Sequence, residues 1–244
     1  MRRGWTTLLP VAAVLVAACG ADEDDPMLVL AAASLTEVFQ ELETAYEQAN
    51  PGEDIELSFA GSGAVRLQID EGVPADVVAL ADDVVMTELA GEGHVATSTV
   101  FATSGLVVAV PADGTAEVTG IESLADPSLL VGLCAVEVPC GRYASDGLAA
   151  AGVDPSVDTF ESDARALTTK LALGELDAGV VYTTDVTALD GELVSVAPLD
   201  GVEATYPIAA LVDAPHPERA AAFVAFVLSP EARAILDAAD FGTP

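Results

Sequence analysis

Basic residues are scarce in this sequence. Its 244 residues include 8 Lys and Arg against 40 Asp and Glu, a formal net charge of −32 at pH 7. No basic patch of useful size could offset that field, which argues against nucleic acids and anionic membrane surfaces as electrostatic partners. The acidity favours solubility but does not specify a fold.

The residue types that carry most catalytic and metal chemistry are also few. The chain has 2 His and 3 Cys, and Lys170 is its single lysine. His94 and His216 lie in turn-like segments without the spacing of metal ligands or of a Ser-His-Asp triad. We therefore expect no metal site, no cofactor and no enzyme. A secreted hydrolase with Ser34 or Ser62 as nucleophile stays an alternative, although no general base is evident beside either.

The N-terminus has the features of an export signal. Arg2 and Arg3 precede an apolar run over residues 8–18, which ends in small residues directly before Cys19. The run is too short for a membrane span of about 20 residues. It resembles a bacterial lipobox, so we predict a signal peptide over 1–18 and lipidation of Cys19. The alternative is an ordinary signal with an incidental cysteine. Residues 19–26 are acidic and aperiodic, as in a tether.

Removal of the signal and lipidation of Cys19 leave Cys134 and Cys140 as the remaining thiols. Outside the cytosol such a pair is more typical of a disulfide than of a redox or metal site. We therefore predict a structural Cys134–Cys140 bridge.

The remaining chain is rich in apolar residues, at 52% overall, and alternates short apolar runs with helical periods. That alternation predicts an α/β fold whose mostly parallel sheets are covered by helices. The expected strands are residues 28–32, 55–59, 77–80, 106–110, 129–133, 178–182 and 208–212. The expected helices are 35–49, 64–69, 83–90, 143–151, 164–173, 217–228 and 230–239.

Two strand-to-helix junctions carry serines that could meet a ligand, because ligands of open α/β sheets bind beyond the carboxyl ends of strands. Ser34 follows the first strand, although Ser34 and Glu37 also fit a capping box. Ser62 stands between Gly61 and Gly63, where the backbone can approach an anion and the next helix offers free N–H groups. A plain flexible loop is the alternative for this second junction.

Three further positions belong to the same set of junctions. Cys140 lies at a junction that leads into a helix, and Ala164 begins another helix for which Ser162 or Asp163 could be the N-cap. Tyr182 ends a strand, so its hydroxyl could face the same cleft, and a half-buried core aromatic is the alternative.

Taken in order, these junctions resemble the periplasmic molybdate-binding proteins of ABC transporters. The resemblance covers residues 27–242 and is carried by five short segments. These are AAASLT at 31–36, SFAGSG at 58–63, GVPADV at 72–77, VPCGRYA at 138–144 and GVVY at 179–182.

The resemblance implies a two-lobed type II periplasmic binding protein fold, with mixed, mostly parallel sheets flanked by helices and the ligand cleft between the lobes. Lobe 1 would join residues 27–105 to 206–244, and lobe 2 would be residues 106–205. The chain would cross between them near 104–109 and 204–208.

The resemblance also implies a ligand set. Ser34 and Ser62 would bind oxyanion oxygens through hydroxyl and backbone N–H groups, Cys140 and Ala164 through backbone N–H groups, and Tyr182 through its hydroxyl. The family commonly has alanine at the position of Cys140. The cysteine keeps the backbone N–H donor, but a Cys134–Cys140 bridge could either stiffen the loop or shift it and alter selectivity. The role of Arg142 is also left open.

These expectations define a function. An exported lipoprotein, anchored to the outer face of the cell membrane or periplasmic, would bind molybdate or tungstate and deliver it to an ABC permease. We expect a monomer whose contact with the membrane is through its N-terminal lipid only. The alternatives are the same fold holding sulfate or a small organic anion, and a purely structural surface lipoprotein.

Overall fold

The computed structural model describes residues 25–189 and 191–244. The predicted signal peptide, the lipidation site Cys19 and most of the predicted tether lie outside this range. Within it, no helix is both long and apolar enough to cross a membrane.

One mixed eight-stranded sheet runs through the structure in the order β2-β1-β3-β8-β4-β7-β5-β6. At one end β1 pairs in parallel with β2 and β3, and at the other β5 pairs in parallel with β6 and β7. The central strands β4 and β8 pair antiparallel with each other and with their other neighbours. The strands are β1 Met27–Ala32, β2 Ile55–Ala60, β3 Val77–Ala79, β4 Thr99–Pro111, β5 Val131–Cys134, β6 Thr159–Glu161, β7 Ala178–Tyr182 and β8 Leu193–Ala210.

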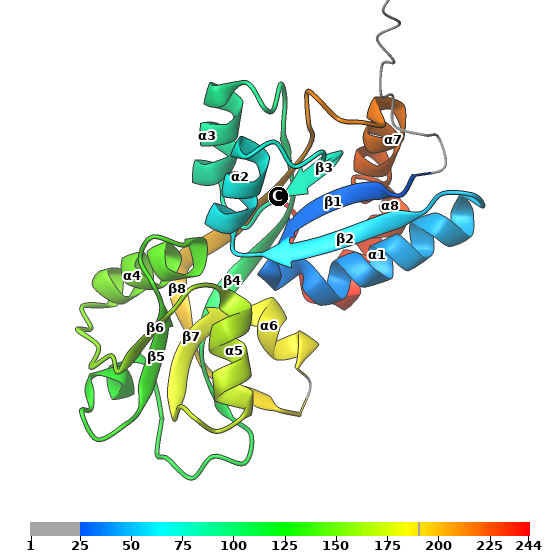
Figure 1. Cartoon of the computed structure of the whole chain (residues 1–244). Coiled ribbons are helices and arrows are strands. Elements are labelled where there is room, and N and C mark those ends of the chain that lie inside the picture. The colour runs from blue at the N-terminus through cyan, green and yellow to red at the C-terminus, as the bar shows by residue number, and fades with distance from the viewer. Residues whose placement is uncertain (1–24, 190) are drawn as a thin grey trace, which may run out of the picture.

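The helices divide the molecule into two halves that are joined by β4 and β8 (Figure 1). The first half holds β1 to β3 with α1 to α3, α7 and α8, and the second holds β5 to β7 with α4 to α6. The predicted two-lobed α/β fold is thus confirmed. The helices are η1 Ala33–Leu35, α1 Thr36–Ala49, α2 Ser62–Asp70, α3 Asp83–Glu92, η2 Ile121–Ala125, α4 Pro139–Ala151, α5 Ala164–Ala172, α6 Thr183–Ala188, α7 Pro217–Val227 and α8 Pro230–Ala238, where η marks a 3₁₀ helix.

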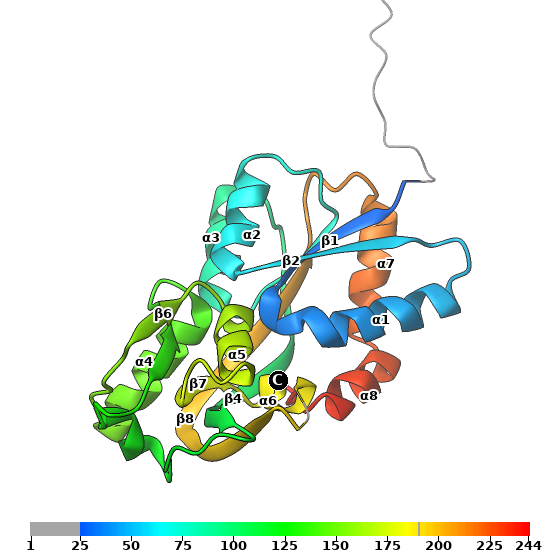
Figure 2. The same cartoon turned by 60° about the horizontal axis from the view of Figure 1, so that its bottom comes forward.

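Burial explains why the first strand reads as a continuous apolar run. Val29 and Ala31 of β1 face the large core under α1, α7 and α8, while Leu30 faces a second core under α2 and α3. Figure 2 shows these two helix layers on opposite faces of the first half. A strand covered on both faces needs apolar residues at every position.

The long strands are the main departure from the sequence expectations. The predicted segments 106–110 and 208–212 are parts of β4 and β8, and both strands extend much further. The missed portion of β8 is mostly exposed or half-buried and contains Pro198 and Gly201, so its sequence does not have the pattern of a covered strand. These strands supply the antiparallel pairs at the centre of the sheet, which is mixed as predicted.

Both predicted crossing points lie inside these long strands. Register shifts interrupt the β4–β8 ladder at three places, one of them between Gly105 and Val107. Such irregularities bend a strand locally. The lobe boundaries at 105/106 and 205/206 stay a prediction.

Two predicted helix starts were wrong. Helix α2 begins at Ser62, two residues before the predicted start, and α4 begins at Pro139, four residues before it. Proline is favoured in the first turn, where its missing N–H is not needed. The short elements β6 and α6 were not predicted at all.

Candidate functional site

A small pocket lies where the two halves meet. Its cavity volume is about 20 Å³, compared with about 10–15 Å³ for one bound water. The pocket therefore suits a solute of few atoms. The five residues predicted to bind a ligand are all among those that line it: Ala32, Ala33, Ser34, Gly61, Ser62, Ala81, Val138, Pro139, Cys140, Asp163, Ala164 and Tyr182.

Helix α2 brings Ser62 to the pocket from the first half. Its N-cap, Gly61, has no side chain to satisfy the first backbone N–H groups, which have no intrahelical partners. Ser62 is only 1% exposed, and its Oγ accepts a hydrogen bond from the Ala81 N–H at 3.3 Å. That contact leaves the hydroxyl proton of Ser62 free to be donated to a ligand.

Gly61 is a point of close approach between the halves. A Cβ at this position would come within 3.1 Å of the Ser162 carbonyl oxygen in the second half. A side chain here would hold the halves apart, so the glycine permits the close approach that encloses the pocket.

Ser34 does not form the capping box that was its alternative explanation. Helix α1 begins at Thr36 with Leu35 as its N-cap, and no side chain caps it. The Oγ of Ser34 is buried without a hydrogen bond to any described residue. Burial raises the pKa of the Tyr206 hydroxyl, and the nearby Ser34 hydroxyl lowers that pKa by a smaller amount.

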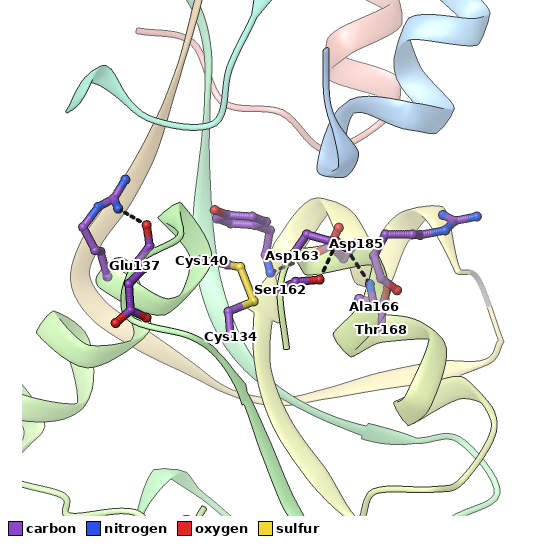
Figure 3. The surroundings of a disulfide bond; sticks show 11 residues. Cys134, Glu137, Cys140, Ser162, Asp163, Ala166, Thr168 and Asp185 are labelled. Atoms are coloured by element: carbon purple, nitrogen blue, oxygen red, sulfur yellow. Dashed lines mark hydrogen bonds between the residues drawn. A yellow bond between two sulfur atoms is a disulfide. The ribbon is translucent and has the colours of Figure 1, made fainter. Parts of the chain in front are cut away.

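Cys140 enters the pocket at the start of α4, where the N-cap Val138 also offers no side-chain acceptor. A disulfide joins Cys140 to Cys134 at the end of β5, with a Cα–Cα distance of 5.7 Å (Figure 3). Next to it, a Cβ on Gly141 would clash with the Ala135 carbonyl. The bridge and the glycine together hold the first turn of α4 against the end of β5.

Ala164 begins α5, and Asp163 is its N-cap, as one of the two sequence readings predicted. Asp163 Oδ1 accepts a hydrogen bond from the Ala166 N–H at 2.8 Å, and Oδ2 accepts one from Ser162 Oγ at 3.1 Å (Figure 3). Both oxygens of the Asp163 carboxylate therefore already accept hydrogen bonds, from the start of α5 and from Ser162, although Asp163 lines the pocket.

Tyr182 ends β7 with its side chain 1% exposed and its hydroxyl without a hydrogen bond to a described residue. Burial raises the pKa of Tyr182 well above its ordinary value, so the phenol is neutral and able to donate. Its backbone N–H donates to Asp185 Oδ2 at 3.0 Å. Burial, opposed by that hydrogen bond, raises the pKa of Asp185 to about 7.

Arg142, whose role the sequence left open, does not line the pocket. Its guanidinium forms an ion pair with Asp82, which follows β3 in the first half, and donates to the Glu137 carbonyl at 2.8 Å. Asp82, Ala81 and Tyr206 are neighbours of the site that the sequence reasoning missed. The end of β3 is another strand-to-helix junction, so the rule that found Ser34 could have found the first two.

The arrangement is chemically suited to an anion. Starts of helices or helical turns converge from both halves, and each offers N–H groups together with a partial positive charge. Two serine hydroxyls and a tyrosine hydroxyl complete the set of donors. Neither serine has a hydrogen bond to a histidine or a carboxylate in the described parts of the chain, so neither has the neighbouring general base that would activate it as a nucleophile.

The comparisons with known proteins agree with this geometry. Residues 27–242 match the family described as "Bacterial extracellular solute-binding protein". The molybdate-binding protein ModA of Mycobacterium bovis is 32% identical over 221 residues, which cover 89% of this chain and 85% of that protein. The chain therefore belongs to the bacterial extracellular solute-binding proteins, which are transport components and not enzymes.

Two solved structures have the same fold. The periplasmic molybdate-binding protein of Azotobacter vinelandii has a TM-score of 0.76 at 18% identity, covering 89% of this chain and 99% of that one. The sulfate-binding protein SubI of Mycobacterium tuberculosis has a TM-score of 0.77 at 18% identity, covering 88% and 86%. At such identities the similarity establishes the fold alone.

Proposed function

We propose that this protein captures molybdate in the pocket between its halves and delivers it to the permease of an ABC transporter. The observation that supports the proposal best is a small pocket lined by hydrogen-bond donors from both halves. In it Ser34, Ser62 and Tyr182 provide hydroxyls, and the N-terminal amides at Ser62, Cys140 and Ala164 provide backbone donors. Tungstate, a similar tetrahedral dianion, is expected to bind in the same way.

The donor set favours a fully deprotonated anion. Molybdate has only acceptors, so each oxygen can be met by an N–H or O–H group. Phosphate near pH 7 carries a proton that needs an acceptor, and the Asp163 carboxylate is already engaged by Ala166 and Ser162. An unmet buried polar group costs about 1–3 kcal/mol, so phosphate is expected to bind more weakly.

Sulfate is the second candidate, because it is also a dianion without protons and the sulfate-binding SubI shares the fold. Sulfate is smaller than molybdate, so the two are separated by the size of the cage.

Calorimetric titration of the exported chain with molybdate, tungstate, sulfate and phosphate tests the proposal. We expect tight one-to-one binding of molybdate and tungstate, weaker sulfate and no measurable phosphate. Absence of heat with every oxyanion would refute an oxyanion receptor, and a preference for sulfate would move the assignment to sulfate transport.

Export and anchoring form part of the same proposal. The basic start, the short apolar run and Cys19 support a lipoprotein held outside the cytosol, with residues 19–26 as its tether. Mass spectrometry of the membrane fraction should find a diacylated peptide beginning at Cys19, and Cys19→Ser should release the protein as a soluble monomer. A wild-type chain recovered without lipid would leave an ordinary secreted receptor.

A further inference from the structure

An ion pair whose carboxylate is buried crosses from one half of the molecule to the other beside the pocket. Arg142 belongs to the first turn of α4, two residues beyond Cys140, and Asp82 directly follows Ala81. Both Cys140 and Ala81 line the pocket. Asp82 is 2% exposed, and Arg142 Nη2 and Asp82 Oδ2 are buried with no hydrogen bond to any other described residue.

Each partner is also tied to its own half. Asp82 Oδ1 accepts the Val85 N–H at 3.0 Å and so caps α3. Arg142 Nη1 donates to the Glu137 carbonyl at 2.8 Å, within the loop that precedes α4 (Figure 3). Each charged group is therefore tied to its own half by a hydrogen bond, and their contact connects the start of α3 with the start of α4.

Other ion pairs of the chain differ in burial or in place. Arg165 of α5 pairs with Glu37 of α1 across the same boundary, but both side chains are more than one-third exposed. Exposed pairs contribute about 0–1 kcal/mol. Arg66 pairs with Asp70, Glu88 and Glu92, all in the first half. In the Arg142–Asp82 pair the Asp82 side chain is only 3% exposed, although that of Arg142 is 28% exposed. A buried carboxylate left without its partner is strongly unfavourable.

The position of the pair couples it to the oxyanion donors. Ala81, one residue before Asp82, donates its N–H to Ser62 Oγ and so orients that hydroxyl. Cys140, on the opposite wall, lies at the N-terminus of the helix that carries Arg142. The contact between Arg142 and Asp82 thus links the two segments that carry the Ser62 and Cys140 donors.

We propose that Arg142 and Asp82 form a clamp that sets the width of the oxyanion cage and thereby discriminates between tetrahedral anions of different size. The proposal rests on the oxyanion-binding function given above. The two residues position the donors and do not touch the anion. Because their charges neutralise each other, the clamp adds no net attraction for anions in general, and size becomes the basis of selection.

Two substitutions, one in each half, test the clamp. Asp82→Asn removes the charge but keeps an oxygen that can cap α3, since asparagine is as good an N-cap as aspartate. Arg142→Gln removes the charge from the other side. The double variant is included because removal of both charges leaves neither one buried alone. Arg66→Gln is the matched control, a basic residue whose partners all lie in the first half.

The measurements are calorimetric affinities for molybdate and sulfate, stopped-flow dissociation rates and thermal unfolding without ligand. Each single variant should weaken molybdate binding by about tenfold or more, as expected when a buried charge loses its partner. Sulfate affinity should fall less, so the molybdate-to-sulfate ratio drops at least about threefold. The double variant should bind no worse than the singles, and Arg66→Gln should change neither affinity by more than about twofold.

The outcomes separate the two proposals. A wild-type protein that binds no oxyanion would refute the proposed function. Wild-type binding that survives unchanged in both single variants would overturn the clamp alone. An equal loss of molybdate and sulfate affinity would also overturn it, because the pair would then close the halves without setting the cage width. Cooperative unfolding with a midpoint well above the temperature of the binding assay verifies that each variant is folded.

Discussion

Replacement of Ser62 by alanine separates binding from folding more cleanly than any other single change in the pocket. Ser62 is 1% exposed, and its Oγ is held as an acceptor by the Ala81 N–H at 3.3 Å. The hydroxyl proton of Ser62 is therefore free to be donated to a ligand in the pocket. Ser62→Ala deletes that donor and adds no bulk.

The magnitude follows from these contacts. Loss of a hydrogen bond to an anion should cost about 1–3 kcal/mol, which raises the Kd for molybdate about 5- to 150-fold. The effect on the unliganded protein should be small, because the 3.3 Å contact to Ala81 is at the long end of hydrogen bonding and water can enter the pocket. The free energy of unfolding should therefore change by less than about 1 kcal/mol.

Calorimetric titration and urea unfolding of the same preparations provide the assay. Ser195→Ala is the control, since Ser195 is an exposed serine in β8 and its loss should change neither quantity. An unchanged Kd in Ser62→Ala would remove Ser62 from the site. A large fall in stability with a proportionate fall in affinity would show that Ser62 supports the fold and does not contact the anion.

Three further predictions concern the disulfide, one buried acid and the overall charge. The double variant Cys134→Ser/Cys140→Ser should weaken molybdate binding, because the first turn of α4 is held less firmly. It should also lower the free energy of unfolding, measured with denaturant, by about 2 kcal/mol. Unchanged stability and affinity would contradict a structural role. The pKa of Asp185 is raised to about 7, so the folded state binds this proton more tightly than the unfolded state, and stability falls as pH rises from about 4 to 7. Asp185→Asn, which keeps an acceptor for the Tyr182 N–H, should raise the unfolding midpoint at pH 7 by at least about 2 °C and lose that advantage near pH 4; a gain that is independent of pH would refute this linkage. Finally, molybdate association should accelerate as salt is raised from low concentration, because the net charge of −32 repels a dianion and salt screens that field; a stopped-flow rate that falls steadily with salt would indicate a positive funnel at the cleft.

The sequence determined the features that depend on neighbours along the chain. The helical period of α1 places Val38, Phe39 and Leu42 in the core, and the buried β1 reads as an unbroken apolar run. Asp163 before Ala164 indicated the start of α5. Such features are local, since a helix face, a covered strand and an N-cap each involve residues a few positions apart.

The tertiary structure alone decided which of those features became a site. Ser34 had a local explanation, the capping box, that the fold does not use. Much of β8 is exposed or half-buried, so its pairing with β4, and not an apolar pattern of its own, makes it a strand. The pairing of Arg142 with Asp82 joins residues from opposite halves. No periodicity reports such contacts, because they exist only when long segments of chain have closed on one another.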